Sequence, residues 1–196
     1  MTLDPIWQPR NQQRVYRVLL EAHSFPGRVI DLPAELNAQP ATLSVLATLL
    51  DNSTSFCDVD GLVSPEDQLR LEAPPAAAGG ADFLLFQADL PPPEGFTPRL
   101  GDVYHPHEGA TLVLGGRSIT EGHARFELSG PGIESRQSLH LTGFDTAWFT
   151  RREPWVSAYP TGVDLILCDA SHITAIPRTT AMRSLIEATS TEGGRA

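Results

Sequence analysis

A chain of 196 residues with 41% hydrophobic residues can bury a core without a disulfide or a metal, and we expect a single domain over 1–196 with flexible ends at 1–10 and 190–196. The 24 acidic and 14 basic residues give a formal net charge of -10, which argues against a nucleic acid or an anionic membrane surface as partner. All 14 basic residues are arginines, so the chain has neither the lysine of a Walker-type phosphate loop nor the lysine that forms a Schiff base with pyridoxal phosphate.

The sequence favours an intracellular compartment. Its first residues contain no apolar run of signal-peptide length, and no stretch approaches the roughly 18 apolar residues of a membrane span. Cys57 and Cys168 lie far apart in apolar, strand-like runs. We interpret them as buried reduced thiols, with a disulfide as the alternative. We therefore expect a cytoplasmic protein.

Apolar periodicity predicts helices along the whole chain. The helix that starts at Ser64 has the clearest beginning, because Ser64 offers a hydroxyl cap, Pro65 suits the first helical position, and acidic residues follow in the first turn. The predicted helices cover 11–23, 41–50, 64–73, 144–155 and the stretch from Thr179 onward.

Short apolar or alternating runs predict strands between these helices. The early runs are continuously apolar and the later ones alternate, which is typical of a mixed sheet covered by helices. We therefore expect an α/β fold in which helices pack on both faces of a mixed sheet. The predicted strands cover 53–59, 82–87, 110–114, 123–128, 137–141, 163–168 and 172–176, with 28–30 as a short strand or an extended lead-in.

Three familiar kinds of catalytic site find little support. His105 and His107, with Glu108 beside them, could ligate zinc or iron, but Pro106 and Gly109 favour a solvated loop, so we expect no metal site. The glycines at 115–116 and 130–132 lack the spacing of a dinucleotide cradle and are typical of turns. No Gly-x-Ser-x-Gly motif marks a nucleophilic serine. We predict no catalytic residue and no cofactor.

Two other features each leave a structural and a functional interpretation open. Aromatic residues crowd 148–159 and could belong to the core or to a protein interface. In Pro177-Arg178-Thr179-Thr180, either threonine could cap the last predicted helix. Alternatively, Arg178 could hold an anion at the helix N-terminus or contact a partner.

The same C-terminal residues carry a resemblance to a known family. The strings YPTGVDLIL at 159–167 and AIPRTT at 175–180 resemble the C-terminal signature of PhnH, a subunit of the bacterial carbon–phosphorus lyase core complex. Further segments resemble that family and stand in its order, from about residue 15 to 182. They are LLEAHSFPG at 19–27, TLSVL at 42–46, GATLVL at 109–114 and LSGPGI at 128–133.

The resemblance implies a fold similar to the large domain of pyridoxal-phosphate-dependent transferases, without the cofactor. It also implies a homodimer that joins the PhnG, PhnI and PhnJ subunits. The assembly supports displacement of adenine from ATP by a phosphonate, which forms ribose 1-phosphonate 5-triphosphate, and later cleavage of the carbon–phosphorus bond. The chain would be an accessory part of this enzyme system and not catalytic alone, since its two cysteines cannot hold the iron–sulfur cluster of the radical step.

Four residues are the candidate site on this interpretation. Asp164, Arg178, Thr179 and Thr180 would form an anion-binding corner or a contact with a partner subunit. The alternative is an autonomous transferase or hydrolase that grips a phosphorylated ligand through Arg178. Which surface binds the other subunits, and what His105 and His107 do, is left open by the sequence.

Overall fold

The computed structural model describes residues 4–36 and 38–185. Within them, 3₁₀ turns accompany longer helices whose apolar faces are regular: α1 buries Asn11, Val15, Leu19 and Ala22, which recur every three or four residues. The helices are η1 (Pro5–Trp7), α1 (Pro9–Ser24), η2 (Ala34–Leu36), α2 (Ala41–Leu49), α3 (Pro65–Leu71), η3 (Pro106–Glu108) and α4 (Ala147–Trp155). None of these helices has the length and apolar character needed to span a bilayer.

The main sheet has six strands in the order β1-β8-β7-β4-β3-β2. Its centre is parallel, because β2, β3, β4 and β7 run in one direction, while β8 runs antiparallel to both of its neighbours, β7 and β1. The strands are β1 (Ile30–Asp31), β2 (Phe56–Asp58), β3 (Phe83–Gln87), β4 (Thr111–Gly115), β7 (Asp164–Cys168) and β8 (His172–Ile176).

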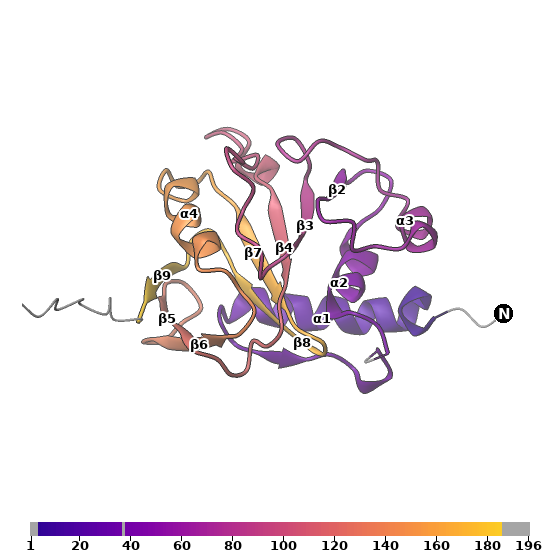
Figure 1. Ribbon diagram of the computed structural model, residues 1–196, viewed down its shortest axis with the longest axis horizontal. Coiled ribbons are helices and arrows are strands. Elements are labelled where there is room, and N and C mark those ends of the chain that lie inside the picture. The colour runs from indigo at the N-terminus through magenta and orange to yellow at the C-terminus, as the bar shows by residue number, and fades with distance from the viewer. Residues whose placement is uncertain (1–3, 37, 186–196) are drawn as a thin grey trace, which may run out of the picture.

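A smaller antiparallel sheet has the order β6-β5-β9 and lies beside α4 (Figure 1). It contains the hairpin of β5 (Ala124–Ser129) and β6 (Gln137–Leu141), and β9 (Ala181–Ser184) on the other side of β5. The sheet is therefore built from segments on both sides of β7 and β8 in the sequence.

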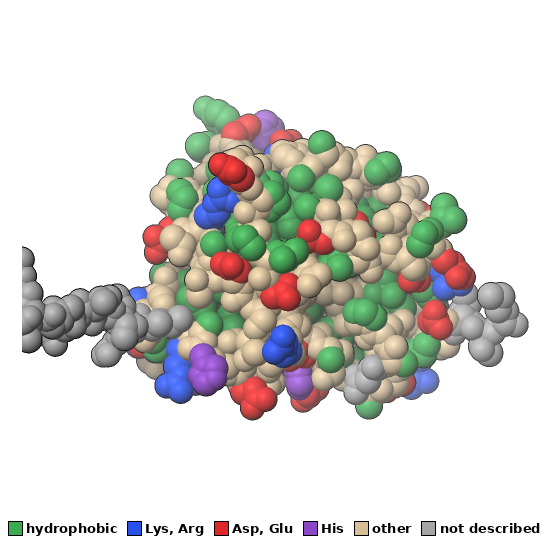
Figure 2. All heavy atoms as spheres, viewed as in Figure 1, with side chains coloured by type: hydrophobic (Ala, Val, Ile, Leu, Met, Phe, Trp, Pro, Cys, Tyr) green, Lys and Arg blue, Asp and Glu red, His purple; other side chains and the backbone are tan. Residues whose placement is uncertain are grey.

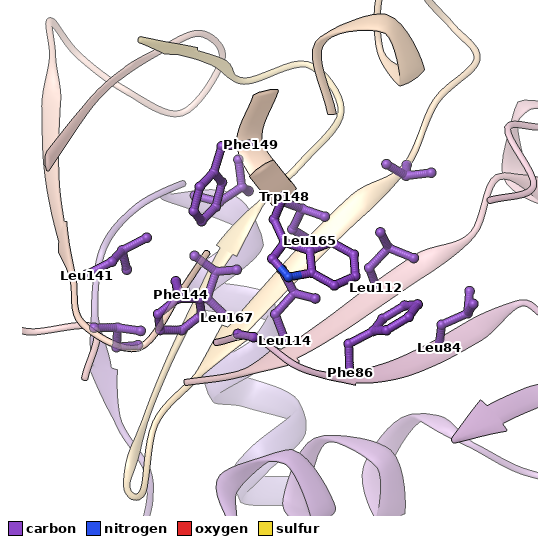
Figure 3. Packing of buried hydrophobic residues seen from close by; sticks show 14 of the residues in the cluster. Leu84, Phe86, Leu112, Leu114, Leu141, Phe144, Trp148, Phe149, Leu165 and Leu167 are labelled. Atoms are coloured by element: carbon purple, nitrogen blue, oxygen red, sulfur yellow. The ribbon is translucent and has the colours of Figure 1, made fainter. Parts of the chain in front are cut away.

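Both faces of the main sheet are buried, each by a different layer. On one face α1 and α2 cover Leu85, Val113 and Ile166. On the other face, α4 and the small sheet cover alternate residues of the same strands, including Leu112 and Leu165. Figure 3 shows the ring of Trp148 of α4 lying among Leu112, Leu114 and Leu165, while Phe149 points to the side of the small sheet, where its ring is 4.6 Å from that of Phe126. Strands buried on two faces explain the continuous apolar runs in the sequence.

Most predicted elements are confirmed, with shifts of a few residues at their ends. The mixed α/β sheet is confirmed, and helices lie on both faces, although the β5–β6 hairpin and β9 share one of these faces with α4. Ser64 caps α3 as predicted, since its Oγ accepts the N–H of Asp67 at 3.1 Å. Residues 28–30 lead into the two-residue β1.

The predicted helix from Thr179 onward is wrong over residues 181–184, which form β9. The reason is tertiary: β5 would otherwise have an unpaired edge, and Leu128 pairs with Met182 across it. Arg183 also reaches Glu127 of β5 at 2.8 Å. The rest of that predicted helix, 186–196, lies outside the described residues.

The segment 1–10, for which we expect flexibility, includes residues that pack against the rest of the chain. Ile6 in η1 is completely buried, and Asn11 Nδ2 donates to the carbonyl of Pro5 at 2.7 Å, so this segment packs into the core. Residues 1–3 and 190–196 lie outside the described residues.

Candidate functional site

The predicted site residues Asp164 and Arg178 meet at one edge of the main sheet. Asp164 is the first residue of β7, and Arg178 follows the end of β8 by two residues. Because β7 and β8 are antiparallel, with Leu165 opposite Ile176, the start of one strand lies beside the end of the other. The sheet itself therefore brings together two residues that are 14 positions apart.

Arg178 binds Asp164 through both its backbone and its side chain. Its Nη2 lies 2.6 Å from Asp164 Oδ2, its Nε lies 3.2 Å from the same oxygen, and its backbone N–H donates to Oδ1 at 2.7 Å. The side chains are only 15% and 22% exposed. A charge-assisted pair with this geometry and burial fixes the end of β8 on the start of β7.

The third nitrogen of Arg178 ties two loops to this pair. Nη1 donates to the carbonyl of Pro106 at 2.6 Å and lies 3.5 Å from that of Pro160. Gly109 permits this approach, because a Cβ there would lie 2.2 Å from the carbonyl oxygen of Gly162 and 2.8 Å from Nη1. All three nitrogens of the guanidinium therefore donate to oxygens of this chain.

A second arginine, which the sequence analysis missed, supports the same segment. Arg152 of α4 is 3% exposed and donates to the carbonyls of Pro177 at 2.7 Å and Thr180 at 3.1 Å. Burial lowers the pKa of Arg152 to about 10, and the charge of Asp164 opposes that shift. Its position was a usable signal: it lies four residues after Trp148 and three before Trp155, on the buried face of α4.

Thr179 and Thr180 have no helix to cap. Thr180 is 1% exposed, and its N–H donates to the carbonyl of Pro177 at 2.9 Å, which closes a turn before β9. Thr179 is exposed. The predicted anion seat at a helix N-terminus is therefore absent from residues 179–185. We call Asp164, Arg178 and Arg152, with the segment 177–180 that they hold, the arginine corner.

The histidine motif lies in an exposed loop near this corner. His105 is in contact with Asp102, whose pKa is lowered chiefly by hydrogen bonding to the imidazole and to the backbone N–H of His105. The rings of His105 and His107 are 6.0 Å apart. Across residues 4–36 and 38–185, no group of three or more His, Cys, Asp or Glu side chains is placed to hold a metal ion.

The glycine-rich turns are explained by close packing. A Cβ at Gly116 would lie 2.0 Å from the ring of Phe144, and one at Gly132 would lie 2.3 Å from the carbonyl oxygen of Ser24. Side chains at these positions would displace neighbouring elements. Close packing therefore explains why glycine is required at these positions, without a bound ligand.

The aromatic cluster divides between the core and the surface. Trp148, Phe149 and Trp155 are at most 7% exposed, and the ring of Trp148 lies 4.6 Å from that of Phe86. Tyr159 is 74% exposed. The core interpretation therefore holds for these residues of α4, and Tyr159 is accessible to solvent, so an interface at that position stays a prediction.

Both cysteines are free thiols in the structure. Cys168 is completely buried, and burial raises the pKa of its thiol well above the usual range. Burial also raises the pKa of the half-buried Cys57. Neither thiol is therefore disposed to ionise near neutral pH.

Comparisons with known proteins point to one family. Residues 6–183 match a family described as "Bacterial phosphonate metabolism protein (PhnH)". The chain is also 40% identical over 176 residues to a Stutzerimonas stutzeri protein named "Putative C-P lyase subunit protein HtxG". That match covers 89% of this chain and 87% of the relative.

Proposed function

The chain belongs to the PhnH family of bacterial phosphonate metabolism proteins, and from this premise we propose that it is an accessory subunit of a carbon–phosphorus lyase complex. The observation that carries the proposal is the 40% identity to a protein named as a C-P lyase subunit, over nearly the full length of both chains. A match of that extent supports a shared role in the assembly and not only a shared fold.

The finer proposal concerns partners and reaction. We propose that the chain forms a homodimer in the cytoplasm and joins PhnG, PhnI and PhnJ subunits. In that assembly it supports the step in which a phosphonate displaces adenine from ATP. Its fold would be the cofactor-free version of the large domain of pyridoxal-phosphate-dependent transferases. A parallel sheet core with helices on both faces and a sequence without lysine support this likeness.

We propose that the arginine corner orders a contact surface for other subunits. Arg178 holds the carbonyls of Pro106 and Pro160, and the loops that contain these prolines carry the exposed Tyr104 and Tyr159, at 88% and 74% exposure. Tyrosines on rigid loops are well suited to interfaces, because little conformational freedom is lost when they bind.

Anion binding at the corner is the weaker proposal for the same residues. A phosphate would have to displace Asp164 or two backbone carbonyls from the guanidinium of Arg178. The alternative function, an autonomous transferase or hydrolase, requires Arg178 to bind a phosphorylated ligand. The contacts that already occupy its guanidinium therefore weigh against that function as well.

The accessory role is tested by measuring adenine release from ATP and methylphosphonate. We expect no release by the purified chain alone, and release by the combined subunits that falls at least ten-fold when this chain is left out. Arg178→Ala protein should restore less release than the wild type, because the contact loops lose their anchor. Turnover by the chain alone would contradict the accessory role and return attention to a phosphate clamp.

A further inference from the structure

An apolar groove lies between β2 and α3, far from the arginine corner in Figure 1. Its volume is about 650 Å³. Phe56 and Leu71 line it and are 7% and 3% exposed, whereas Leu69 lines it and is 81% exposed. A solvent-exposed leucine beside a groove lined by apolar side chains is typical of a surface that another molecule covers.

The fold explains why this groove stays open. β2 is the last strand of the main sheet, and among the described residues its outer edge is paired only by a short bridge between Phe56 and Pro75. On α3, Leu69 and Leu71 are two residues apart and so face different sides of the helix. Leu71 enters the core, and Leu69 remains at the rim of the groove.

The rim of the groove is acidic. Asp58 lines it and accepts the N–H groups of Leu62 and Val63 at 3.0 and 2.8 Å. Among residues 4–36 and 38–185, no arginine or histidine forms an ion pair with this carboxylate. Glu72 lies between the lining residues Leu71 and Ala73, and its exposed side chain makes no hydrogen bond or ion pair within the described part of the chain. Arg70, the cation of α3, already pairs with Glu66 at 2.6 Å.

This combination selects the chemistry of an occupant. Acidic groups at a surface repel a phosphonate or a nucleotide and attract lysine or arginine. The lining offers apolar contact and few polar side chains, which suits a leucine, isoleucine or phenylalanine anchor. Figure 2 shows hydrophobic side chains over α3, with acidic side chains and an arginine beside them.

We propose that this groove binds a segment of a partner subunit in which a large apolar side chain is flanked by lysine or arginine. The inference rests on the proposed function, since it supplies one contact of the chain with its complex. It assigns that contact to the β2–α3 edge, separate from the loops ordered by Arg178.

The test uses the full chain, tagged and co-expressed with the other core subunits of its host. Leu69→Asp is the first variant, because the side chain is 81% exposed and its replacement should leave the fold intact. Glu72→Lys is the second and reverses one rim charge. Leu90→Asp is the matched control, since Leu90 is 50% exposed and does not line the groove. Thermal melting of each variant checks the fold.

We expect Leu69→Asp to reduce co-purification of the other subunits at least ten-fold and Leu90→Asp to leave it unchanged. Glu72→Lys should weaken co-purification at low salt, and the difference from wild type should shrink at high salt. A photo-crosslinking residue at position 69 should attach to an apolar segment with adjacent basic residues.

Full co-purification with Leu69→Asp and Glu72→Lys would overturn the inference and leave the proposed function standing. A crosslink to an acidic segment, or a small cationic molecule retained in the groove in place of a protein segment, would also overturn it. If even the wild type recovers no other subunit, the proposed function fails and the inference with it.

Discussion

At the scale of single residues, Arg178 acts on the structure of its own chain. The sequence singled out Arg178 and Asp164 as members of one site, and the structure places them in contact at 2.6 Å. The sequence could not show that all three guanidinium nitrogens donate hydrogen bonds, because Pro106 and Pro160 are brought to Arg178 only by the folding of two loops. Arg152 was missed because an arginine in a helix is usually solvated.

The pairing of Arg178 with Asp164 predicts non-additive effects on stability. Arg178→Ala leaves a mostly buried carboxylate without its cation, so we expect a loss of about 2–4 kcal/mol in the free energy of unfolding, and a similar loss for Asp164→Ala. The double variant should lose clearly less than the sum. Urea unfolding measures all three. Arg183→Ala is the control, with a loss below about 1 kcal/mol, since Arg183 is 70% exposed. Additive losses at 164 and 178 would contradict the coupling.

At the scale of elements, the sequence predicted helices correctly where the stabilising contacts join residues close to one another in the chain. Ser64 caps α3 through a neighbour three residues away, and the spacing of Val15 and Leu19 is sufficient to place α1. The helix predicted over 181–184 is wrong because this segment pairs with Leu128 and its neighbours in β5, which lie more than fifty residues earlier in the chain. Helix propensity in so short a segment is weaker than pairing with an open strand edge.

The β7–β8 turn predicts a loss of stability in acid. Burial alone would raise the pKa of Asp169, but hydrogen bonds from the N–H groups of Ser171, Ile119 and His172 outweigh it and hold the pKa below the usual range. In the unfolded chain Asp169 protonates near the ordinary pKa of about 3.9. Its stabilisation is therefore present above about pH 4 and is lost as the pH falls through the lower folded-state pKa.

The variant Asp169→Asn checks this turn. It should reduce stability at pH 7 and flatten the decline in unfolding free energy as the pH falls below about 4, because one depressed carboxylate has been removed. Urea unfolding at a series of pH values measures both effects. An unchanged slope together with unchanged stability at neutral pH would show that the turn does not depend on this charge.

At the scale of the whole molecule, composition and the order of elements were enough to predict a mixed α/β sheet, but the strand order was not predictable. The β5–β6 hairpin lies outside the main sheet, and β9 pairs with β5 only after β7 and β8 have been added to the main sheet. The small sheet therefore combines segments that no local pattern connects. The β2–α3 groove also escaped prediction, since Leu69 has the same appearance in sequence as the buried Leu71. Both features depend on which edges the completed sheets leave open.

Affinity purification of the tagged chain from its host, grown with a phosphonate as sole phosphorus source, tests the central claim most directly. Mass spectrometry of the co-eluting chains should find the other subunits of the carbon–phosphorus lyase complex in a fixed ratio to this chain. Recovery of this chain without them, even after crosslinking in intact cells to retain a labile complex, would contradict the claim that it is a subunit.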